Sequence, residues 1–208
     1  CLDSDQNANI FGTTFGLWSY HCVSAQHVKS ANLCERLMKI ASTENDVGYV
    51  IEAHLAHGVT NYFRGQFKES LPYLEHVISN YDSSRHANHV IEFGQDPKTL
   101  ALAHSAWIHF ILGDSKRANQ YSHEAISHAR ALDHPYSLTF ALVYDGATQL
   151  YMGNIENAKQ SLTEAKQISH DRKVRGVAAL AEVFFAMMRV FTEPSSETVA
   201  EAERHIQF

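Results

Sequence analysis

The sequence has few residues that interrupt regular structure. Its 208 residues include only four prolines and ten glycines, and alternating β-branched residues are rare. Proline and glycine are the usual breakers of helices, and Ala, Leu, His, Glu and Ser fill the stretches between them. We therefore expect an all-α chain. A composition with 45% hydrophobic and 19% charged residues is ordinary for a globular protein and excludes a disordered one.

The chain also lacks a long apolar run and a run of basic residues. The longest apolar stretch, VAALAEVFFAMMRVF from Val177, contains Glu182 and Arg189 and is shorter than the roughly 20 residues that span a bilayer. It is interpreted as a buried helix, and no membrane partner is expected. The formal net charge is -6 and no run of Lys or Arg occurs, so no nucleic-acid partner is expected either.

Cysteine is scarce as well. The three cysteines, at positions 1, 22 and 34, form no C-x-x-C pair, and an odd number suggests free thiols in a reducing compartment. We therefore expect a cytoplasmic protein. The chain begins at Cys1 without an initiator Met or a signal-peptide pattern, so we expect a piece of a larger protein.

What the chain does have is an internal repeat. HGVTNYFRGQFKESLPYLEHVI, SAWIHFILGDSKRANQYSHEAI and DGATQLYMGNIENAKQSLTEAK align without a gap. Centred on the expected corners at Ala25, Gly65, Gly113, Gly153 and Glu193, the repeats are 40, 48, 40 and 40 residues apart. We predict about five helix-turn-helix hairpins, over residues 9–45, 48–80, 97–131, 136–170 and 174–208, in a single domain.

Two features of the repeat support hairpins. Nine of the ten residues that stand seven before and five after the corners are small, Trp18 being the exception, and small residues are needed where two antiparallel helices approach closely. A corner glycine can adopt the left-handed conformation that ends a helix. Three and two residues before the corner stand mostly bulky pairs, which we expect to fill the interface between neighbouring hairpins. The pairs are Cys22 and Val23, Tyr62 and Phe63, Phe110 and Ile111, Leu150 and Tyr151, and Val190 and Phe191.

The segments GVTNYFRGQFKES and GATQLYMGNIENA resemble the tetratricopeptide repeat, which implies a right-handed superhelix, or α-solenoid, of stacked hairpins. The family unit has 34 residues, so the helices here are longer. This long variant resembles the helical repeats of bacterial signalling ATPases linked to class III adenylate or guanylate cyclases, and of some transcriptional activators. LWSYHCVSA, YDSSRHANHVIEFGQDP and LDHPYSLTFAL are similar to phrases of that cyclase-linked region.

The 48-residue spacing adds a segment, interpreted as an inserted loop over residues 81–96. Asp96 followed by Pro97 predicts a helix that begins at Pro97. One interpretation is a tether after an elongated second helix. The other is that Arg85, His86 and His89 face a partner or an anionic ligand.

No catalytic or metal-binding motif is found. His123 and His128 are five residues apart and point about 140° apart on a helix, so they cannot share a metal. The pairs His54/His57 and His86/His89 have no nearby Cys or carboxylate that completes a ligand set. No catalytic residue, metal or cofactor is therefore assigned.

The first helices of stacked hairpins line the concave, usual binding surface. That lining is mainly apolar here, so an apolar helix or peptide suits it better than a charged one. The candidate groove residues are Tyr62, His104, Trp107, Phe110, Tyr144 and Tyr151.

The leading hypothesis is a non-catalytic, regulatory protein-interaction module of a larger bacterial signalling protein, whose partner is a protein, a peptide or a neighbouring domain of the same chain. Apolar terminal repeats could also pair two copies as a homodimer. An alternative is a small-molecule effector sensor with a pocket among His104, Trp107, Tyr144 and Tyr151. A further alternative is a metal-dependent enzyme that uses histidines of the inserted loop.

Overall fold

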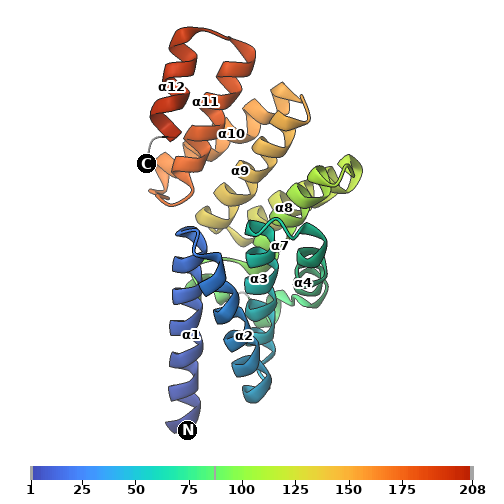
Figure 1. Ribbon diagram of the computed structural model, residues 1–208, viewed down its shortest axis with the longest axis vertical. Coiled ribbons are helices and arrows are strands. Elements are labelled where there is room, and N and C mark those ends of the chain that lie inside the picture. The colour runs from blue at the N-terminus through green and yellow to red at the C-terminus, as the bar shows by residue number, and fades with distance from the viewer. Residues whose placement is uncertain (1, 87, 207–208) are drawn as a thin grey trace. The chain divides into compact units, whose positions relative to one another are not determined.

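The computed structural model describes residues 2–86 and 88–206, and within them all regular structure is helical (Figure 1). This confirms the expected all-α class. The end of the predicted fifth repeat, residues 207–208, and Cys1 lie outside the described residues. Cys22 and Cys34 are buried free thiols, as expected. None of the described helices is long and apolar enough to cross a membrane.

The helices are named in chain order. They are α1 (Leu2–Val23), α2 (His27–Glu44), α3 (Val47–Phe63), α4 (Phe67–Asn80), α5 (Ser83–His86), α6 (His89–Glu92), α7 (Pro97–Ile111), α8 (Ser115–Leu132), α9 (Pro135–Tyr151), α10 (Ile155–Asp171), α11 (Ala178–Thr192) and α12 (Ser196–Ile206).

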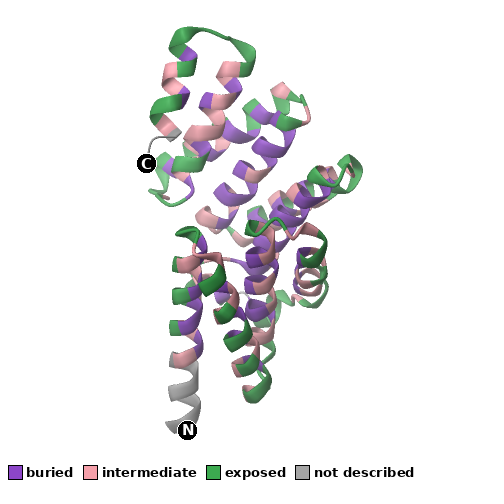
Figure 2. Cartoon of the chain, in the orientation of Figure 1, coloured by how far each residue is buried: buried purple, intermediate pink, exposed green. Residues whose placement is uncertain are grey.

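The chain divides into two compact units, residues 1–108 (unit 1) and 109–208 (unit 2). In unit 1, α1 packs on α2, α2 on α3, and α3 on α4. In unit 2, α8 packs on α9, α9 on α10, α10 on α11, and α11 on α12. Consecutive helices from α1 to α4 and from α8 to α12 are therefore neighbours. α3 and α9 each lie against helices on both sides and bury many of their residues (Figure 2).

The corners lie where the repeat predicts them. The residues with a positive φ at these corners are Ala25 (55°), Gly65 (72°), Gly113 (87°) and Gly153 (80°). The following amide bonds back to a carbonyl in the preceding turn, for example Gln66 N to Asn61 O at 2.9 Å, which closes the helix end. The corner between α11 and α12 is different, because Glu193 has a φ of -136°.

The small residues seven before the corner permit close packing within hairpins, as predicted. A Cβ atom on Gly58 of α3 would lie 2.5 Å from Leu74 Cδ2, and one on Gly146 of α9 would lie 2.6 Å from Leu162 Cγ. Five residues after its corner, Ser70 donates a hydrogen bond to the Gly58 carbonyl at 2.6 Å. Glycine is needed at both positions because the opposing leucine occupies the space of a side chain.

The added segment is not an irregular loop. α4 ends at Asn80, and the one-turn helices α5 and α6 follow it, so the second helix is not elongated. Gly94 has a φ of 73°, and the Asp96 carboxylate accepts hydrogen bonds from Thr99 N and Oγ1, both at 2.7 Å. Asp96 thus caps α7, which begins at Pro97 as predicted.

Candidate interaction surface and buried polar clusters

An apolar side chain is exposed at the same repeat position before every corner. The exposed fractions two residues before the corners are 79% for Val23, 43% for Phe63, 42% for Ile111, 47% for Tyr151 and 63% for Phe191. Scattered exposed apolar residues are normal on protein surfaces, but recurrence at one structural position is not explained by chance exposure. We call these five residues the corner residues.

The corner residues correct the expectation that both members of each bulky pair fill the interface between hairpins. Only the member three residues before the corner turns inward: Cys22 and Leu150 are each 4% exposed, and Tyr62, Phe110 and Val190 are partly buried. Successive helical residues point about 100° apart. One of two adjacent side chains can therefore face the neighbouring helix while the other faces outward.

Some corner residues lie against aromatic rings. In unit 1 the His27 ring stacks on Phe63 with 6.0 Å between centroids, and Val28, next to His27, is 76% exposed. In unit 2 Phe110 lies 6.4 Å from Tyr151. These contacts fix the orientation of both corner rings without covering them.

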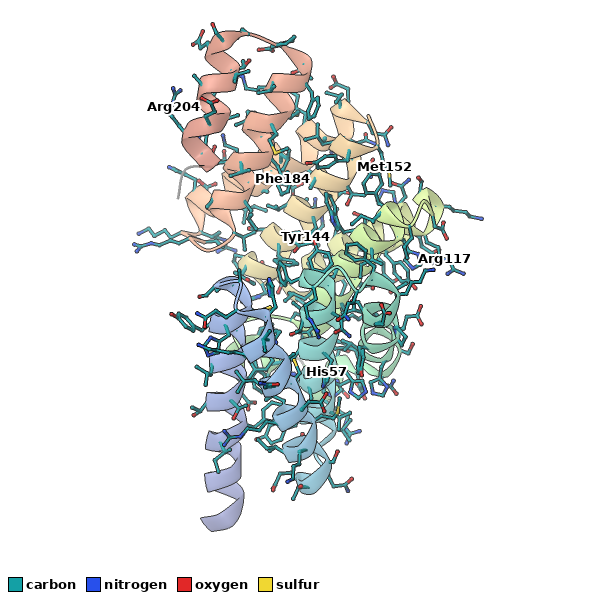
Figure 3. The ribbon with its side chains drawn as sticks, in the orientation of Figure 1. His57, Arg117, Tyr144, Met152, Phe184 and Arg204 are labelled. Carbon is teal, nitrogen blue, oxygen red and sulfur yellow. The ribbon has the colours of Figure 1, made fainter. Side chains whose placement is uncertain are left out.

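Several of the predicted groove residues lie in ring contact with one another or with a neighbouring ring. Tyr62 and His104 are in edge-to-face contact at 4.7 Å in unit 1, and Tyr144 stacks on Phe140 at 4.5 Å in unit 2. Tyr151 is the most exposed of the six, and Trp107 and Phe110 are partly buried. Figure 3 shows Tyr144 on α9. The contacts thus pair some of these residues within a unit.

His104 is buried rather than presented to a ligand. It is 2% exposed, and its Nδ1–H donates to the Leu100 carbonyl at 2.8 Å. Burial lowers the pKa of His104 to about 4, because the charged imidazolium would lose its hydration. The side chain is therefore a neutral part of the core.

The residues singled out in the added segment face different ways. Arg85 is exposed, whereas His86 and His89 are 2% and 6% exposed. The His86 ring lies edge-on to His89 at 5.2 Å, and its Nδ1 accepts a hydrogen bond from Asp82 N at 2.9 Å. The two histidines anchor the segment, and Arg85 is the exposed one of the three residues.

His89 is held by Glu52, a residue that the sequence analysis did not single out. His89 Nδ1 lies 2.6 Å from Glu52 Oε1, and Glu52 is fully buried in α3. Burial raises the pKa of Glu52 to about 7, against the opposing effect of the His89 hydrogen bond. Glu52 Oε2 has no hydrogen-bond partner among the described residues. The sequence feature that could have indicated a buried acid is the single Glu within the apolar stretch YVIEAHLA.

A second buried acid, Asp145 of α9, is held differently. It is 5% exposed and accepts hydrogen bonds from Ser122 Oγ of α8 at 2.6 Å and from Ser161 Oγ of α10 at 2.5 Å, one on each oxygen. Gln149 Nε2 adds a longer bond of 3.3 Å. The carboxylate therefore ties three consecutive helices of unit 2 together.

The other histidine pair of the sequence analysis, His54 and His57, packs against aromatic rings. His54 stacks on His76 at 3.8 Å, and His57 stacks on Tyr73 at 4.8 Å. Figure 3 labels His57 on unit 1. Within residues 2–86 and 88–206, no group of three or more His, Cys, Asp or Glu side chains could hold a metal ion.

Comparisons with known proteins return no match to this chain among family models, curated proteins or solved structures.

Proposed function

We propose that this chain is a non-catalytic helical-repeat module that binds a protein partner through its corner residues. The observation that carries the proposal is the recurrent exposure of Val23, Phe63, Ile111, Tyr151 and Phe191 at one position of the repeat. Exposed apolar side chains lose hydration favourably when a partner covers them. A repeated position offers a partner several equivalent anchors.

The repeat itself supports a tetratricopeptide-like solenoid as the scaffold. Consecutive helices pack as neighbours in each unit, and left-handed corner residues recur at Gly65, Gly113 and Gly153. The similarity of LWSYHCVSA and YDSSRHANHVIEFGQDP to cyclase-linked signalling ATPases supports placing the module in a larger bacterial signalling protein. Its partner is then another protein or a neighbouring domain.

The partner chemistry follows from the corner residues, which are aliphatic or aromatic. An amphipathic helix that inserts apolar side chains at regular intervals matches such anchors. Aromatic residues such as Tyr151 and Phe191 are typical sources of binding energy at interfaces.

The test replaces these two anchors together in the double variant Tyr151→Gln and Phe191→Gln. Photo-crosslinking from positions 151 and 191 in cells of the host organism identifies the contacted protein, and calorimetry with the purified pair measures the affinity. Loss of two interface anchors should weaken binding about thirtyfold or more. Tyr151 is 47% and Phe191 63% exposed, so the fold should remain intact by circular dichroism.

The matched control changes exposed residues on the second helices of the same hairpins, Thr163→Gln with Glu197→Gln. It should retain the affinity of the unmodified chain. Equal affinities for the control and the corner variant, or crosslinks from position 163 but none from 151 or 191, would refute the proposal.

A further inference from the structure

One position of the repeat faces the preceding hairpin. It lies five residues before the corner on the first helix of each hairpin. In α3 it is Thr60, whose hydroxyl accepts a hydrogen bond from Trp18 Nε1 of α1 at 2.8 Å. In α11 it is Met188, which packs with Leu150 of α9 in one buried cluster. We call this position, together with the one three residues earlier on the same side of the helix, the backward face of a first helix.

The opposite side of a first helix faces the following hairpin. Phe11 of α1 lies fourteen residues before its corner and stacks on Tyr49 of α3, with 4.1 Å between the ring centroids. Positions fourteen and five before the corner are nine residues apart, so their side chains point about 180° apart on the helix. Position ten lies one turn after position fourteen and shares its side. We call positions fourteen and ten the forward face.

The backward face is buried in the later first helices but exposed in α1. In α3, α7, α9 and α11 the residue five before the corner is at most 3% exposed. These residues are Thr60, Ile108, Thr148 and Met188. In α1 the same position is Tyr20, which is 58% exposed, and the other residue of the backward face, Leu17, is 46% exposed. α1 therefore presents an apolar surface of the kind that a preceding hairpin covers in α3 and α11.

The forward face shows the reverse pattern, because it is buried in the earlier first helices and open in α11. In α1, α3, α7 and α9 the residue fourteen before the corner is 0% exposed. These residues are Phe11, Ile51, Thr99 and Thr139. In α11 the same position is Ala179, which is exposed. Leu180, at the edge of this face, is 42% exposed, whereas its equivalent in α9, Phe140, is 8% exposed. α11 therefore presents an uncovered apolar surface towards a following hairpin.

We propose that copies of this chain associate head to tail, with the backward face of α1 in one copy covering the forward face of α11 in the next. Each copy carries both halves of the contact that neighbouring hairpins make within the chain. Leu17 and Tyr20 hold the repeat positions through which Phe185 and Met188 pack against Leu150 of α9. Removal of these apolar side chains from water favours the association.

The contact joins two different surfaces, so it differs from a symmetric dimer. Each pair of copies still has one free backward face and one free forward face, and a third copy can add to either. The expected homodimer thus becomes the first step of a head-to-tail series. Both faces are separate from the corner residues, so this association and the proposed binding of a partner protein can each fail alone.

Sedimentation velocity of the 208-residue chain, over about a hundredfold range of concentration, tests the association. The average mass should rise with concentration beyond that of two copies. Two variants each remove one face, Leu17→Glu with Tyr20→Glu for the backward face and Ala179→Glu with Leu180→Glu for the forward face. All four residues are exposed, so both variants should fold by circular dichroism. Each variant alone should associate about tenfold more weakly or less. An equal mixture should form dimers and nothing larger, because each variant supplies the face that the other lacks.

The matched control is Val28→Glu with Ile91→Glu, which places the same two charges on apolar residues that are 76% and 83% exposed and belong to neither face. It should associate as the unmodified chain does. A chain that stays monomeric throughout would overturn the proposal and leave the two faces to another protein. Association of the forward-face variant alone would also overturn it, since that result requires a symmetric contact through α1. A mixture that remains monomeric, or equal weakening by the control, would have the same consequence.

Discussion

Units 1 and 2 each bury one carboxyl group within a first helix of a hairpin, but they stabilise it in different ways. Asp145 in unit 2 has a serine hydroxyl on each oxygen. Glu52 in unit 1 has one close partner, His89, and its second oxygen has none among the described residues. A buried carboxylate needs several donors to remain charged, and one with fewer donors favours its protonated form.

The two units therefore differ in the kind of polar group that surrounds their buried side chains. Unit 2 uses hydroxyl donors, which do not change charge near neutral pH. In unit 1, burial raises the pKa of Glu52 to about 7 and lowers that of His104 to about 4; unit 2 also buries one histidine, His109. We therefore expect mutation of donors to affect unit 2 most, and pH to affect unit 1 most.

The largest expected effect comes from removing both hydroxyl donors in Ser122→Ala with Ser161→Ala. The Asp145 carboxylate would remain buried after losing both short hydrogen bonds. Leaving a buried acceptor without its donor costs about 1 to 3 kcal/mol per bond, so the loss of both bonds should lower the free energy of unfolding by about 4 kcal/mol. Urea denaturation followed by circular dichroism measures it.

A matched control replaces exposed hydroxyls on the same two helices, Ser127→Ala and Thr163→Ala. It should change the free energy of unfolding by about 0.5 kcal/mol or less. Equal loss in both double variants would mean that Asp145 does not depend on these donors.

The next effect is acid destabilisation of unit 1 through His104. Its pKa is about 4 in the folded chain and 6.5 in the reference state, so the unfolded chain binds more protons in this window. The contribution of His104 to the free energy of unfolding should be fully present above pH 6.5 and should fall by about 3 kcal/mol as the pH drops to 4.

His104→Phe keeps an aromatic ring against Tyr62 and removes the titration. Its free energy of unfolding should therefore decline less than that of the unmodified chain between pH 6.5 and 4. Parallel pH dependences for the two proteins would assign the acid sensitivity to other groups.

A third effect should be the same in both units, because both use glycine for close helix packing. Gly58→Ala and Gly146→Ala each place a methyl group against a leucine, Leu74 or Leu162. Overpacking of this kind costs about 2 kcal/mol. Gly16→Ala in α1, where nothing lies within 4 Å of the new Cβ, should instead stabilise by up to about 1 kcal/mol. A loss at Gly58 alone would show that the units do not share this packing rule.

The sequence was sufficient for features that depend on local spacing. The helical class, the corners at Gly65, Gly113 and Gly153, and the cap at Asp96 each follow from residues close together in the chain. The exposure of the corner residues could also have been deduced, because two adjacent helical side chains cannot both face one neighbour.

Contacts between distant residues could not be predicted in this way. Glu52 and His89 are 37 residues apart, and Ser122 and Ser161 approach Asp145 from two other helices. Only the packing of the helices brings these groups together. The same reason explains why one of the two interpretations placed His86 and His89 at a partner surface, since the sequence does not show that His89 reaches Glu52 of α3.

The smallest effect at pH 5 is expected for Glu52→Gln, which tests the comparison most directly. Because the pKa of Glu52 is raised from 4.5 to about 7, the folded state holds its proton across this window while the unfolded state loses it. The unmodified chain should therefore lose stability relative to the Gln variant as the pH rises from 4.5 to 7. At pH 5, where folded Glu52 is neutral like Gln, the two should differ by about 1 kcal/mol or less.

Asp145→Asn is the counterpart in unit 2, and it should cost more at pH 5 than Glu52→Gln. An Asn side chain replaces one acceptor oxygen by an NH₂ group, which cannot accept the bond from Ser122 or Ser161. Chemical denaturation of both variants at pH 5 and pH 8 gives the two differences. If Glu52→Gln cost as much as Asp145→Asn at pH 5, or if its cost did not change with pH, the two acids would be held in the same way and the distinction between the units would fail.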